Sequence, residues 1–189
     1  MKNLRELILN RGQDWLRILS MNIVNPKMKL YFDTSALVKE FVNETGSAEV
    51  KQYVVEKVHQ EDVVFSTAVI TKAEIAAALS AMRRNRELTQ PKLDEAVSRF
   101  QKRWKLFNIV NASLAVIEKS YQIGLQHKIK GSDAFQLASA LIDGTELLIS
   151  CDRDLNAAAK KEGIQVWNPM NGKFEPIKEE PEPSDDQER

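Results

Sequence analysis

The chain has 189 residues, the length of one ordinary domain, and folding a chain of this size buries roughly 70% of its surface. Its 27 Lys and Arg balance 27 Asp and Glu, which excludes a uniformly basic nucleic-acid coat and a purely acidic solvating chain. The single cysteine, Cys151, excludes an intramolecular disulfide, so a reducing cytoplasm is the expected compartment. With only two histidines, His59 and His127, a zinc site of the His/Cys kind is nearly excluded.

The first 27 residues read as a separate amphipathic extension. Charged residues interrupt the apolar run that a signal peptide needs, and the chain has no run of about 18 apolar residues, so we expect no membrane span. Six apolar residues fall on one helical face instead: Leu4, Leu7, Ile8, Trp15, Ile18 and Leu19.

Strands and helices then alternate along the chain. In order, we expect a strand over 28–32, helices from Thr34 to Val42 and over 47–58, a strand over 63–66, helices over 69–86 and 91–107, a short strand over 108–110, helices over 113–127 and 131–144, a strand over 147–150, a helix over 154–162 and a strand over 164–167. This alternation predicts a three-layer α/β/α sandwich with a mostly parallel central sheet over residues 28–170.

Charge is unevenly distributed despite the zero sum. Residues 82–105 hold eight Lys and Arg against three acidic residues, which gives a basic face on the expected helices. Residues 171–189 are rich in Glu, Asp and Pro and too poor in apolar residues to fold alone, so they are predicted to form a disordered acidic tail. From Phe174 to Arg189 this tail has seven acidic and two basic residues.

Four acidic residues fall where an open parallel sheet places its ligand crevice, at the carboxyl ends of the strands and the adjoining helix starts. Asp33 ends the first strand, Glu74 lies in the helix after the second, Asp133 begins a helix, and Asp152 follows the strand over 147–150. Carboxylates gathered at one crevice repel each other unless a hard cation neutralises them, and oxygen ligands suit Mg²⁺ or Mn²⁺. Such a site favours phosphate chemistry.

Each of these features also has a purely structural interpretation. An Asp at a helix start is most often a cap, which applies to Asp133 and still more to Asp154. Cys151 is more simply a small buried hydrophobe than a nucleophile, and His59 and His127 are most simply exposed residues at helix ends. The basic run is compatible with an ordinary solvated face.

The residues around the four acids carry a family resemblance. The segments are Asp33-Thr34-Ser35-Ala36-Leu37-Val38-Lys39, Ser66-Thr67 through Glu74-Ile75 to Leu79, Ser132-Asp133-Ala134-Phe135-Gln136-Leu137-Ala138, and Ser150-Cys151-Asp152-Arg153-Asp154-Leu155. Together and in this order they resemble the four motifs of the PIN domain, and most closely those of VapC-type toxins of toxin–antitoxin pairs. Two features depart from that family: the residues before Met28, a typical start in the family, and the acidic tail.

The resemblance implies a site and partners. It implies that Asp33, Glu74, Asp133 and Asp152 form a catalytic set that binds Mg²⁺ or Mn²⁺, with Asp154 as an alternative or outer ligand. Ser35 and Ser150 would then be hydroxyls that line the crevice. It further implies a homodimer, and an antitoxin protein that blocks the acidic crevice.

The resulting hypothesis is a metal-dependent endoribonuclease whose basic helices bind the phosphates of RNA. The candidate RNA-binding residues are Arg83, Arg84, Arg86, Lys102 and Arg103. Alternatives are a structure-specific DNA nuclease on the same site and a non-catalytic scaffold that binds RNA or protein. A phosphatase with an aspartyl nucleophile is weaker, because the segment after the first strand reads Asp33-Thr34-Ser35 and lacks the second Asp.

Overall fold

A computed structural model describes residues 28–175; the predicted extension 1–27 and residues 176–189 of the predicted tail lie outside the described residues. The first half contains β1 (Met28–Phe32), α2 (Thr34–Leu37), the 3₁₀ helix η1 (Val38–Glu40), α3 (Ser47–Lys57), β2 (Val63–Ala68), α4 (Thr71–Arg84) and α5 (Gln90–Trp104). The second half contains β3 (Asn108–Val110), α6 (Leu114–His127), α7 (Gly131–Asp143), β4 (Leu147–Ile149), α8 (Arg153–Lys161), β5 (Gln165–Trp167) and η2 (Pro169–Asn171).

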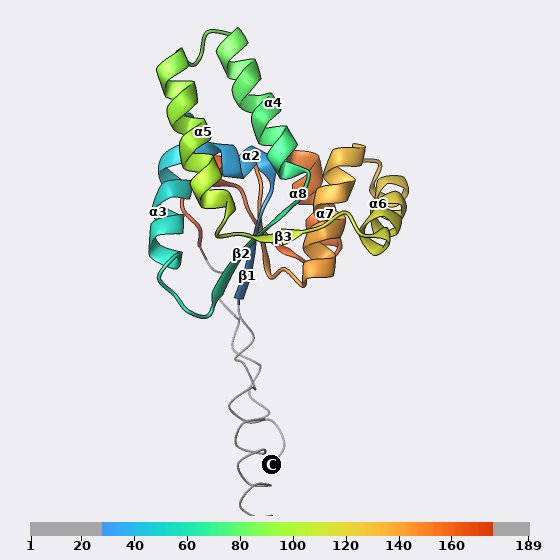
Figure 1. The fold of residues 1–189 in the computed structure, drawn as a ribbon. Helices are drawn as coiled ribbons and strands as arrows, with labels where there is room; N and C mark the ends of the chain where they lie inside the picture. Colours follow the sequence, from blue (N-terminus) through green and yellow to red (C-terminus); the bar gives the residue numbers. More distant parts are fainter. Residues whose placement is uncertain (1–27, 176–189) are drawn as a thin grey trace, which may run out of the picture.

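The five strands form one parallel sheet with the order β3-β2-β1-β4-β5 (Figure 1). The first connections run from β1 outward to β3, and the chain then returns to the other side of β1 to form β4. The strand order therefore reverses between β1 and β4, where Tyr31 pairs with Leu148. Ligands of open parallel sheets bind at such a switch point, at the carboxyl ends of the strands.

Helices cover both faces of the sheet. Side chains alternate along each strand, so β1 places apolar residues on both faces, and each face needs a core. Leu30 and Phe32 of β1 point into a core with α2, α3, α4 and α5, where Phe32 contacts Phe65 and Phe107 edge to face. Tyr31 points into the opposite core, which is closed by α6, α7 and α8. The predicted three-layer α/β/α sandwich with a parallel sheet is confirmed.

Helices α4 and α5 form a hairpin that projects beyond the carboxyl ends of the strands (Figure 1). Near the sheet, Leu79 of α4 and Phe100 of α5 are buried in the first core. At the tip the chain turns through Arg86, whose φ of 64° is left-handed. Both helices are shorter than the expected 69–86 and 91–107, because this turn and the approach to β3 end them earlier.

The end of the described chain packs onto the core. The Phe174 ring lies 5.5 Å from that of Tyr53 and 6.0 Å from that of Trp167. Phe174, which the sequence analysis assigned to the acidic tail, therefore packs against aromatic residues of the core.

The prediction that His127 is an exposed residue at a helix end is wrong. Its side chain is only 5% exposed, and its Nε2 lies 2.7 Å from Oε1 of Glu162. The pair joins the end of α6 to the end of α8, a long-range contact that a local sequence pattern does not reveal. His59 is exposed, as predicted.

Candidate metal and nuclease site

Asp33 lies directly after β1 at the switch point, and its side chain is buried. Its backbone N–H donates to the Ile149 carbonyl at 3.0 Å, which extends the pairing of β1 with β4. Its Oδ2 accepts hydrogen bonds from the Ser35 N–H (3.1 Å), the Ser35 hydroxyl (2.5 Å) and the Ser150 hydroxyl (3.1 Å). The same carboxylate caps α2. Asp33 therefore stabilises the start of this helix and is also a candidate metal ligand.

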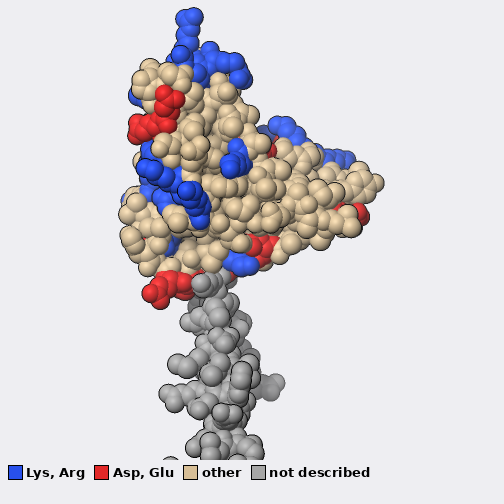
Figure 2. Space-filling model, viewed as in Figure 1, with Lys and Arg blue, Asp and Glu red and all other residues tan. Residues whose placement is uncertain are grey.

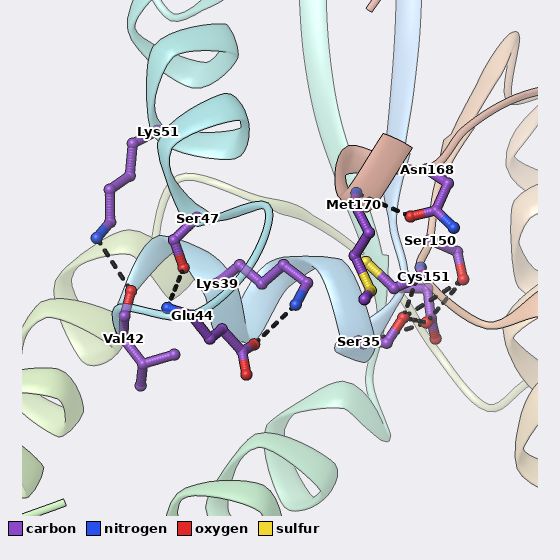
Figure 3. A network of polar contacts seen from close by, with 11 residues as sticks. Ser35, Lys39, Val42, Glu44, Ser47, Lys51, Ser150, Cys151, Asn168 and Met170 are labelled. Carbon is purple, nitrogen blue, oxygen red and sulfur yellow. Dashed lines mark hydrogen bonds and ion pairs between the residues drawn. The ribbon is translucent and has the colours of Figure 1, made fainter. Parts of the chain in front are cut away.

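Ser35 and Ser150 orient this carboxylate from two different elements. The Ser35 hydroxyl also accepts from the Cys151 N–H at 2.9 Å, and the Ser150 hydroxyl accepts from the Asp152 N–H at 3.0 Å. Figure 3 shows Ser35, Ser150 and Cys151 meeting at this point. The two serines predicted to line the crevice therefore join the ends of β1 and β4 around Asp33.

Cys151 beside these serines is half-buried rather than fully buried as its hydrophobic interpretation implied. Burial raises the pKa of its thiol to about 11. The thiol therefore stays protonated near neutral pH, which agrees with the prediction that it is not a nucleophile.

Glu74 reaches the same region from the first turns of α4. Its Oε2 accepts hydrogen bonds from Nε2 of Gln136 at 2.7 Å and from the hydroxyl of Thr34, the residue next to Asp33. Gln136 is 1% exposed, and its Oε1 accepts from the Tyr31 hydroxyl at 2.8 Å. A buried chain of hydrogen bonds thus connects β1, α4 and α7.

Gln136 is a positioning residue that the sequence analysis did not single out. It stands three residues after Asp133, so both lie on one face of α7. An amide among Ala134, Phe135, Leu137 and Ala138 was the available signal, since a polar residue on a buried helix face needs a partner.

Asp133 and Asp152 are the other two acids of the predicted set. Asp133 lies in the first turn of α7 and is partly exposed, with the Ser132 hydroxyl 3.4 Å from its Oδ1. Asp152 caps α8: its Oδ1 accepts from the Asp154 and Leu155 N–H groups, both at 2.8 Å. Asp154 itself is exposed, and its carboxylate pairs with Arg153.

Repulsion between carboxylates links Asp33 with Glu74, and Asp133 with Asp152 and Glu74. Burial raises the pKa of Asp33 against the hydrogen bonds of its serines, and the charge of Glu74 raises it further. The pKa of Asp133 is also raised, first by burial and then by the charge of Asp152, while Lys130 acts in the opposite direction. Crowded carboxylates of this kind are a signature of functional sites.

The donor set fits a hard divalent cation in its chemistry. All four groups offer carboxylate oxygens and lack a buried cation partner among their hydrogen bonds in residues 28–175. As the side chains stand, no three His, Cys, Asp or Glu of that range form a ready-made cage. Mg²⁺ is commonly held by one or two carboxylates with several waters, so these residues would hold it without enclosing it.

The predicted RNA-binding residues are divided by the structure. Arg83, Arg84 and Arg86 are exposed at the tip of the hairpin, and Lys102 is exposed on α5. Figure 2 shows basic side chains at the tip and again where α5 approaches the sheet. Arg103 differs, because its guanidinium pairs with buried Glu40 at 2.6 Å, an ion pair that holds α5 against η1.

The chain is similar to known proteins of one family. The model of the PIN domain family matches residues 30–161. Ribonuclease VapC45 and ribonuclease VapC49, both of Mycobacterium tuberculosis, are 30% identical over 139 residues, which is 72% of this chain and 93% of each relative.

Two solved structures share the fold. A toxin–antitoxin complex from Klebsiella pneumoniae contains a chain that is 24% identical, with a TM-score of 0.52 over 74% of this chain and 97% of that one. PAE2754 from Pyrobaculum aerophilum is 16% identical, with a TM-score of 0.56 over 76% and 92% of the two chains. Among residues 28–175, no helix is long and apolar enough to span a bilayer. The family model that matches residues 30–161 and the relatives at 30% identity show that the chain belongs to the PIN domain family.

Proposed function

We propose that this protein is a metal-dependent endoribonuclease. The observation that carries the proposal is the buried carboxylate of Asp33 at the switch point, held by two serines and repelled by Glu74. The relatives named as ribonucleases, which the chain matches over 93% of their length, support RNA as the substrate class.

The chain's own residues would prepare the site for hydrolysis. Ser35 and Ser150 fix the Asp33 carboxylate, and Gln136 with Thr34 fixes that of Glu74, so little reorganisation is needed on binding. Asp33, Glu74, Asp133 and Asp152 would hold Mg²⁺ or Mn²⁺, with exposed Asp154 as an outer ligand. When bound, the ion supplies charge neutralisation at the phosphate and a lower pKa for the attacking water.

Replacement of Asp33 by Asn tests this mechanism, because Asn keeps the size of the side chain but removes its charge. We expect cleavage of structured RNA in Mg²⁺ to fall about a hundredfold or more. The matched control is Asp94→Asn, which removes a carboxylate from the exposed face of α5, and should leave the rate unchanged. Cleavage by Asp33→Asn at the wild-type rate would contradict the proposal, and faster cleavage of DNA than of RNA would favour a DNA nuclease.

We also propose an antitoxin partner that enters the acidic crevice. The fold is shared with a chain of a toxin–antitoxin complex, and the four carboxylates would attract a basic side chain of such a partner. Titration with a candidate antitoxin encoded next to this gene should abolish RNA cleavage, and the loss of inhibition in a variant without its basic residues would support insertion at this site.

The proposed homodimer has a candidate surface on α6. Leu114, Tyr121 and Leu125 are 82%, 64% and 66% exposed, and with Ile117 they follow the 3 and 4 spacing of a helix seam. A second copy of the chain, packed seam to seam, would cover these residues. Leu125→Glu should convert a dimer into a monomer in sedimentation, whereas Gln122→Glu on the same helix should not.

A further inference from the structure

A groove on the side of the α4–α5 hairpin has a chemistry that the candidate site does not use. It has a volume of about 320 Å³, at the small end of the range of ligand pockets. Its lining contains three lysines, one tryptophan and no acidic residue: Lys72, Ser98, Gln101, Lys102, Trp104 and Lys105. Lys72, Lys102 and Lys105 are exposed.

Trp104 forms the apolar wall of this groove. Its ring packs 5.5 Å from that of buried Phe100, which fixes the indole at the edge of the core. The ammonium of Lys72 lies 5.7 Å from the centre of the Trp104 ring. An exposed, charged side chain therefore lies over the ring, in a position that a flat ligand would take by displacing it.

This combination is the one that binds single-stranded nucleic acid: an aromatic face on which a base stacks, flanked by cations that pair with phosphates. A purely structural role explains the packing of Trp104 on Phe100, but it does not explain three lysines around a partly exposed indole. Like charges placed together repel each other, and a polyanion relieves that repulsion.

The groove and the acidic site share the first turns of α4. Lys72 and Glu74 belong to the same first turns of α4, about 3 Å apart along its axis, but they occupy different sides of the helix. A strand that leaves the carboxylates can thus pass around the start of α4 into the groove. The hairpin tip is farther away, since Arg84 stands about 15 Å along the axis from Glu74.

We propose that this groove is a nucleotide subsite, in which an unpaired base of the RNA stacks on Trp104 while adjacent phosphates pair with Lys102 and Lys105. Lys72 leaves the ring and pairs with a third phosphate. The subsite rests on the proposed ribonuclease function and refines it, because it requires single-stranded RNA next to the cleaved bond.

Binding of a short oligouridylate to the Asp33→Asn protein in EDTA tests the subsite without hydrolysis. Trp104→Leu should weaken binding about 5- to 160-fold, the effect of removing one base stack, whereas Trp104→Phe should retain most of the affinity. In a Trp15→Phe background, oligouridylate should quench the tryptophan fluorescence of the parent protein, and Trp104→Phe should remove the quenching, since the one other remaining tryptophan, Trp167, is buried.

The lysine variants test the subsite even if the substitutions of Trp104 disturb folding. Lys102→Gln with Lys105→Gln should lower the salt dependence of log K by about 0.7 for each phosphate that no longer pairs with a lysine. Lys161→Gln, an exposed lysine at the end of α8 on the other face of the sheet, is the matched control and should have no such effect.

The results separate this inference from the proposed function. If the wild-type protein cleaves RNA but the lysine and Trp104→Phe variants bind and quench as their parent does, the subsite is wrong and the ribonuclease proposal stands. If the wild-type protein neither binds nor cleaves RNA, both are wrong. Loss of quenching together with the reduced salt dependence supports the subsite.

Discussion

The carboxylate site and the α4–α5 hairpin differ in how their charged side chains are held. At the site, each of Asp33, Glu74 and Asp152 is held by donors on other residues, and Asp33 is buried. On the hairpin, the arginines of the tip are exposed. A reaction centre needs fixed geometry, whereas a polyanion is attracted by charge that remains solvated and mobile.

The difference predicts that substitutions at the site change both stability and activity, whereas those on the hairpin change binding alone. Exceptions on the hairpin are Arg99 and Arg103, which both bind Glu40, and Trp104, which packs on Phe100. The following experiments test this division, from the largest expected effect to the smallest.

Gln136→Leu should have the largest effect on stability. It removes the donor to Glu74 and the acceptor of the Tyr31 hydroxyl, which is fully buried, and unsatisfied buried groups are costly. We expect the free energy of unfolding in urea to fall by about 3 kcal/mol, together with RNA cleavage.

The control is Gln122→Leu on the exposed side of α6, which should remain within about 0.5 kcal/mol of the wild type. Equal stabilities of the two variants would show that the buried network does not hold Glu74 in place.

Added Mn²⁺ should stabilise the site end of the molecule. A ligand that binds only the folded state raises the free energy of unfolding by about 2.7 kcal/mol at a concentration of 100 times Kd. Thermal melts in increasing Mn²⁺ should therefore show a rising midpoint, and Asp33→Asn should abolish the rise. An unchanged rise in that variant would place the ion elsewhere.

Arg103→Met should show that the basic residues of the hairpin have two roles, because Arg103 stabilises the fold whereas its exposed neighbours are available to bind RNA. The substitution leaves buried Glu40 without its ion pair, so we expect a loss of about 2 kcal/mol of unfolding free energy, below the range for a fully buried pair because Arg103 is partly exposed. Lys102→Met, one residue away and exposed, should leave stability unchanged and reduce RNA binding. Equal losses of stability would contradict this assignment.

The acids at the strand ends were predictable because the carboxyl ends of parallel strands share one edge of the sheet. Apolar runs mark the strands over 28–32 and 147–150 in the sequence, and Asp33 and Asp152 follow them closely. The roles of Gln136 and Arg103 were not predictable in the same way, since their partners lie 62 and 63 residues away along the chain. A local sequence pattern predicts whether a segment is a helix or a strand from its periodicity. It does not predict which distant side chain contacts that segment.

The pair of His127 and Glu162 is remote from the acids and the hairpin. It gives the smallest predicted effect, and the direction in which its contribution to stability changes with pH can be checked. The hydrogen bond with His127 is the main cause of the lowered pKa of Glu162. A carboxyl whose pKa is lower in the folded state contributes stability above its unfolded pKa, near 4.5, and this contribution is lost as the pH falls through the folded pKa. Glu162→Gln should therefore reduce the free energy of unfolding by under about 1 kcal/mol at neutral pH and by progressively less in acid. A constant difference between the two proteins from neutral pH to below the folded pKa would show that the carboxylate charge of Glu162 does not hold α6 against α8.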